Sequence, residues 1–82
     1  MNTANLVGGI LLRRISPSGA YDYYLIQTLG EAPCYSLFCR SEEDAAFFFD
    51  VCRDRERSLW LTEQLAQGEV SPRYLEEVLE EL

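Results

Sequence analysis

The residues best suited to chemistry in this 82-residue chain are three cysteines and several closely spaced acids. Cys34 and Cys39 are five positions apart, so in a β-strand they would lie on opposite faces and could not chelate a metal without a bulge. The sequence has no histidine to complete such a site. An odd number of cysteines without short paired spacings is also poor support for disulfides. We therefore expect free, buried cysteines, no metal and no cofactor.

The acids form two close pairs that could exchange protons with a substrate. Glu42 adjoins Glu43, and Asp50 precedes Asp54 by four residues. Carboxylates at a turn or helix start more often cap backbone amides, and a chain without histidine lacks the commonest general base near neutral pH. The sequence also has no glycine-rich phosphate loop. These features predict a protein that is not an enzyme, with a small-molecule enzyme as the less favoured alternative.

Charge is distributed unevenly along the chain, whose net charge is −7. Residues 1–40 hold three arginines and two acids, whereas residues 41–82 hold four arginines and twelve acids. Because an acidic half repels phosphate backbones, we expect no direct nucleic-acid binding. The apolar stretch at 6–12 is too short to span a bilayer, and its arginines follow it, the reverse of a secretory signal. We expect a cytoplasmic protein without a membrane partner.

The first half of the chain contains three segments rich in aliphatic, aromatic and β-branched residues, at 5–15, 20–29 and 33–40. Turn-forming residues separate them at 16–19 and 30–33. Three strands joined by short links form an antiparallel meander. Gly8 and Gly9 indicate a weak start of the first strand, a bulge or a close backbone approach.

The segment at 41–52 supports two interpretations. Ser41 followed by Asp44 resembles the capped start of a helix, which would continue through 42–52. However, "FFFDVC" is aromatic and β-branched, and a new helix start follows directly at Asp54. We favour a turn at 41–44 and a fourth strand at 46–52.

Two helices follow. The first is predicted at 55–67 with Asp54 as its N-cap, closed by Gly68 in a positive-φ conformation. The second begins with Ser71 as its cap and Pro72 in its first position. Its apolar stripe is predicted to belong to the core: Leu75, Val78, Leu79 and Leu82. The chain is thus expected to be one small α+β domain spanning 1–82, with both helices packed on one face of a three- or four-stranded sheet.

The strand at 46–52, the helix "DRERSLWLTEQLAQG" and the ending "EVSPRYLEEVLEEL" resemble a family of small bacterial proteins defined by a domain of unknown function. The similarity covers mainly residues 48–82. Members are similar in having Ser-Pro, a spacer, an aromatic residue or histidine, and then an acidic-hydrophobic helix; Tyr74 stands where histidine is expected in many members. The resemblance supports the fourth strand and implies no activity.

Aromatic residues occur at both odd and even positions of the second and third strands, so both sheet faces are expected to be apolar. Two helices cover only one face, which leaves the other for a second copy or another protein, unless tyrosine hydroxyls simply face water. We therefore predict a protein-interaction or regulatory module, a homodimer or a partner-binding chain. The alternative is an acidic inhibitor or decoy of a basic nucleic-acid-binding protein. The candidate interaction residues are Tyr21, Tyr23, Tyr24, Tyr35 and Phe38.

Overall fold

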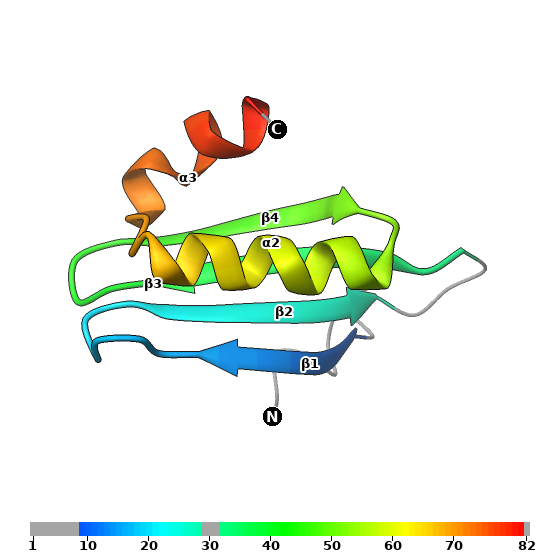
Figure 1. Cartoon of the computed structure of the whole chain (residues 1–82), viewed down its shortest axis with the longest axis horizontal. Helices are drawn as coiled ribbons and strands as arrows, with labels where there is room; N and C mark the ends of the chain where they lie inside the picture. Colours follow the sequence, from blue (N-terminus) through cyan, green and yellow to red (C-terminus); the bar gives the residue numbers. More distant parts are fainter. Residues whose placement is uncertain (1–8, 29–31, 82) are drawn as a thin grey trace.

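The computed structural model describes residues 9–28 and 32–81, which form an antiparallel sheet followed by two helices (Figure 1). The strands lie in the order β1-β2-β3-β4, so each one pairs with its sequence neighbour. The elements are β1 (Gly9–Ile15), β2 (Asp22–Thr28), β3 (Cys34–Arg40), β4 (Ala45–Cys52), α2 (Arg55–Gln67) and α3 (Pro72–Glu80). The predicted α+β meander with two following helices is confirmed.

The segment that allowed two interpretations is a turn and a strand. The amide of Asp44 donates to the Ser41 hydroxyl at 3.1 Å, and the amide of Ser41 donates to the Asp44 carbonyl at 2.7 Å. These bonds close a tight turn, and the chain then returns as β4 against β3. The local capping pattern at Ser41 therefore serves a hairpin, because the following aromatic residues pair in the sheet.

The sheet contains two irregularities. In β1 the register shifts between Leu11 and Arg13, near but not at the predicted glycines; Gly9 itself pairs with Thr28, and Gly8 lies outside the described residues. In β4 the register shifts opposite Ser36, where Asp50 has a φ of 54° and its amide donates to the Ser36 hydroxyl at 3.1 Å. Such bulges redirect the side chains that follow them.

Both helix starts and the end of α2 at Gln67 agree with the sequence, but the backbone conformation of Gly68 does not. Asp54 and Ser71 accept hydrogen bonds from the amides of Arg57 and Arg73, each at 3.2 Å. Gly68, however, has a φ of −81°, so the prediction of a positive φ there is wrong.

The left-handed residue is Glu69, at a φ of 46°. Its amide donates to the Ala66 carbonyl, and the amide of Val70 donates to the Leu65 carbonyl. This is the Schellman pattern of a helix end, shifted one residue beyond the glycine.

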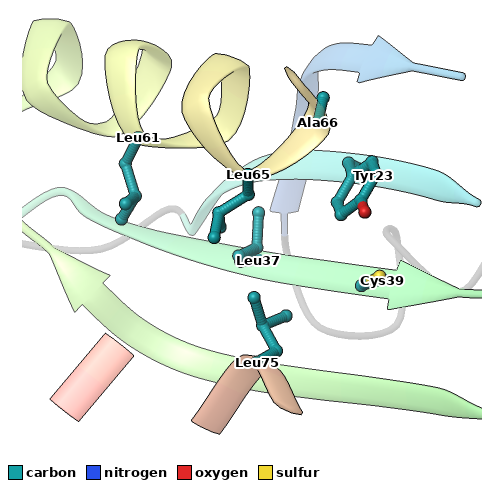
Figure 2. Close-up of a cluster of buried hydrophobic side chains, with 7 residues drawn as sticks. All are labelled: Tyr23, Leu37, Cys39, Leu61, Leu65, Ala66 and Leu75. Carbon is teal, nitrogen blue, oxygen red and sulfur yellow. The ribbon is translucent and has the colours of Figure 1, made fainter. Parts of the chain in front are cut away.

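The core lies between the sheet and the two helices (Figure 2). Its buried side chains are Tyr23, Leu37, Cys39, Leu61, Leu65, Ala66 and Leu75. Both helices therefore pack on the same face, with α3 near the β4 edge (Figure 1). Of the stripe predicted for α3, Leu75 is fully buried, Val78 and Leu79 are half-buried against the core, and Leu82 lies outside the described residues.

Two core side chains also hold the connection between the helices. The Tyr23 hydroxyl donates to the Val70 carbonyl at 2.6 Å, and the Cys39 Sγ lies 3.8 Å from the same oxygen. Burial raises the pKa of both Tyr23 and Cys39, that of Cys39 to about 11, so both remain protonated donors near neutral pH. Neither helix in the described part of the chain is long and apolar enough to cross a membrane.

Candidate interaction surfaces

The five aromatic residues proposed from the sequence divide between the two sides of the sheet. Tyr23 and Tyr35 are buried beneath the helices, and Tyr21 packs half-buried at the margin of the core. Tyr24 and Phe38 lie on the opposite side, where the register pairs them directly. The structure therefore brings only these last two together outside the core.

We call the sheet side opposite α2 and α3 the outer face. Alternate residues of the strands form it, including Leu11, Arg14, Asp22, Tyr24, Ile26, Phe38 and Arg40. The Tyr24 and Phe38 rings are stacked, with centroids 5.6 Å apart and planes 6° from parallel. The guanidinium groups of Arg14 and Arg40 lie 5.6 and 5.7 Å from the Tyr24 centroid, within the range of cation–π attraction.

Asp22 connects these arginines on the outer face. Its carboxylate accepts from Arg40 Nε at 3.1 Å, lies 3.6 Å from an Arg14 nitrogen and accepts from the Ser16 hydroxyl. The Ser16 bond and then the Arg40 bond hold the pKa of Asp22 below its ordinary value. Asp22 is the only acid in β1, β2 and β3, so two arginines and one carboxylate give this cluster a net charge of +1 in a chain of −7.

A second surface is a groove of about 480 Å³ between β4, α2 and α3, which we call the edge groove. Its lining includes Phe47 and Phe48, which are adjacent in β4 and therefore point to opposite sides of the sheet. A groove that both side chains reach must run along the outer edge of β4. The remaining lining residues are Phe49, Val51, Cys52, Arg57, Trp60, Leu61, Glu76, Leu79 and Glu80.

The edge groove holds three of the large apolar side chains that the protein exposes most. Phe49 is 64% exposed, Trp60 50% and Phe47 48%. Sequence reasoning missed this site, although one signal was present: three consecutive phenylalanines in one strand cannot all face the same layer of helices. That β4 is an edge strand, which leaves the rings uncovered, follows only from the strand order.

Charged side chains lie on two sides of the groove. Glu76 and Glu80 are one turn apart on α3, and Arg57 lies opposite on α2. Within residues 9–28 and 32–81 the four ion pairs involve other carboxylates, so Glu76 and Glu80 make none there. The lining therefore carries a net charge of −1.

The acids considered for proton transfer have other contacts. Glu42 and Glu43 lie in the turn before β4, Asp50 pairs with Arg53 at 3.0 Å, and Asp54 caps α2. Cys34 and Cys39 occupy opposite sides of β3, as predicted, and both are buried free thiols. In the described ranges no three cysteine or acidic side chains are grouped to hold a metal ion.

Comparisons with protein-family models, curated proteins and solved structures give no match. The resemblance of residues 48–82 to a family of small bacterial proteins therefore stays a prediction. Function has to be inferred from the two surfaces themselves.

Proposed function

We propose that the protein is a small interaction module that self-associates through its outer face. The observation that carries this proposal is the apolar and aromatic composition of a sheet side over which neither helix lies. Leu11 is 53% exposed there, opposite Ile26 and on the same side as the stacked rings of Tyr24 and Phe38. Burying such side chains against a second copy contributes on the order of 25 cal/mol per Å² before the costs of association.

Electrostatics also favours this side for contact between two acidic chains. Copies that each carry −7 repel one another, and the repulsion is smallest where acids are fewest. The outer face has one acid among three strands, and that acid is already paired with two arginines. A second copy is therefore the occupant that we infer for this face.

The size of the face sets the expected affinity. Strands of this length, at ~3.3 Å per residue and ~4.8 Å between strands, give it a flat area on the order of 450 Å². Two such faces together cover on the order of 1,000 Å², below the roughly 1,200–2,000 Å² of stable interfaces. We expect a weak dimer, with a dissociation constant in the micromolar range or above.

Adjacent residues of β1 provide a matched test. Leu11 points to the outer face, whereas Ile10, 47% exposed, pairs with Gln27 and points to the helix side. Sedimentation equilibrium from about 5 μM to about 500 μM should show a dimer for the wild type and for Ile10→Glu, and a monomer for Leu11→Glu. A wild type that stays monomeric throughout this range, or two variants that dissociate equally, would refute the proposal.

A further inference from the structure

The edge groove adjoins the outer face at Phe47, which pairs with Phe38, but its walls are formed by α2 and α3, and its features define a different occupant. Single exposed apolar side chains are ordinary on protein surfaces, but several gathered around one hollow indicate a binding site. Phe47, Phe49 and Trp60 surround the groove, and Leu61 and Leu79 form apolar parts of its lining. Its volume of about 480 Å³ lies within the usual range of ligand sites.

The position of the groove favours a linear occupant. It follows the outer edge of β4, a strand that pairs only with β3 among the described elements. An exposed edge strand of eight residues offers main-chain groups alongside the apolar lining. Extended segments commonly bind at such edges, with their side chains entering neighbouring pockets.

The charge of the groove wall defines the chemistry of that occupant. Glu76 and Glu80 project from α3 without an ion pair among the described residues, and each is followed directly by another acid, Glu77 within the helix and Glu81 at its C-cap. A cation beside this wall gains attraction, and the overall charge of −7 steers it there. A second copy of this acidic chain would instead meet like charges.

We propose that the edge groove binds a linear segment of a partner protein that carries an aliphatic or aromatic anchor and nearby lysine or arginine side chains. The anchor contacts Phe49 and Trp60, and the cations pair with Glu76 and Glu80. The groove meets the outer face at Phe47, which pairs with Phe38, but its charged wall and Trp60 belong to α3 and α2 on the helix side, so this inference does not depend on self-association.

Trp60 supplies a direct readout, since it is the only tryptophan in the chain and it lines the groove. The probe is a synthetic peptide of about 12 residues built from leucine, arginine and alanine, a composition suited to an apolar groove with an acidic wall. One control peptide has glutamate in place of arginine, and another has serine in place of leucine. We expect the Trp60 emission to shift to shorter wavelength with the first peptide only.

Paired variants of α3 separate a specific wall from general acidity. Glu76→Gln with Glu80→Gln should weaken binding of the arginine-leucine peptide about fivefold, as expected for two partly exposed ion pairs. Glu77→Gln with Glu81→Gln removes the same charge from residues outside the groove lining and should change binding less than twofold. Phe49→Ser should abolish most of the shift while the far-ultraviolet circular dichroism stays that of the wild type.

Three results would overturn the proposal. The first is no Trp60 shift with the arginine-leucine peptide up to about 1 mM, a concentration that detects even very weak binding. The second is an equal shift with the glutamate or serine peptide. The third is an equal loss of affinity in the two glutamine double variants, which would indicate attraction to the net charge alone.

Discussion

Replacing Leu75 with alanine tests whether α3 is an integral part of the folded unit. Leu75 is 0% exposed and packs α3 against the core between the sheet and the helices (Figure 2). Leu79, one turn later, is only half-buried, because part of its side chain lines the edge groove. Tyr74 is 54% exposed and neighbours Leu75 on the same helix. The three positions therefore form a graded series within one element.

The magnitudes follow from burial. A fully buried leucine that is cut to alanine costs about 2–5 kcal/mol, from lost transfer free energy and the cavity left behind. Leu79→Ala should cost less, about 1–2 kcal/mol, since that side chain is only partly buried against the core. Tyr74→Ala should change the free energy of unfolding by less than about 0.5 kcal/mol. A domain of this size has a total stability of roughly 4–12 kcal/mol, so Leu75→Ala should remove a large share of it.

Urea unfolding followed by far-ultraviolet circular dichroism measures all three variants. The transition midpoint should fall in the order Tyr74→Ala, Leu79→Ala, Leu75→Ala, with Leu75→Ala lowest, and the slope should stay that of the wild type. A Leu75→Ala midpoint equal to that of the wild type would show that α3 does not contribute to cooperative unfolding. Equal losses for Leu75→Ala and Tyr74→Ala would show that helix propensity, not burial, controls the effect.

Three further substitutions have defined outcomes. Tyr23→Phe removes the bond to the Val70 carbonyl and should lower the free energy of unfolding by about 1–2 kcal/mol in urea titrations; an unchanged value would contradict the bond. Asp22→Asn should lower the free energy of unfolding near pH 6. Because the folded-state pKa of Asp22 is lowered, this loss of stability should shrink as the pH falls below about 4. A loss that stays the same in urea titrations at several pH values would refute this pH dependence. Glu69→Gly relieves a left-handed non-glycine residue and should raise the free energy of unfolding by up to about 1 kcal/mol, and with it the thermal midpoint, whereas Glu69→Ala should not. Equal midpoints for the two variants would argue against strain at this residue.

The parts of the fold that depend on local sequence could be predicted from it. Asp54 and Ser71 act on amides two or three residues away, so both helix starts agree with the structure. The end of α2 at Gln67 was predicted correctly, but the left-handed residue that follows it was misplaced by one position, because the choice between Gly68 and Glu69 depends on how Val70 reaches the core. The bulges could not be predicted, since a bulge is a property of two paired strands.

The interaction surfaces were predicted only in part. Alternation correctly separated Tyr23 from Tyr24, but it could not say which of the two would lie beneath the helices. Which of the two tyrosines is buried depends on the apolar faces of α2 and α3, and these faces pack against the side of the sheet that holds Tyr23. The edge groove lies between three consecutive elements, β4, α2 and α3, whose packing on one another is not specified by local sequence, and Trp60 joins the groove because α2 contacts β4 as well as the other strands.

The pairing of every strand with its sequence neighbour has a consequence for biosynthesis. A nascent chain can form its hairpins one after another as β1 to β4 emerge, since no pairing waits for a distant segment. The helices that cover one side of the sheet are made after all four strands, and the second of them ends at Glu80. At about 5–20 residues per second, roughly 1.5 to 6 s separate the completion of β4 from that of α3. During this interval the side of the sheet that faces the helices is covered only in part, first by neither helix and then by α2 alone, so the unfinished chain exposes apolar strand residues that chaperones can bind.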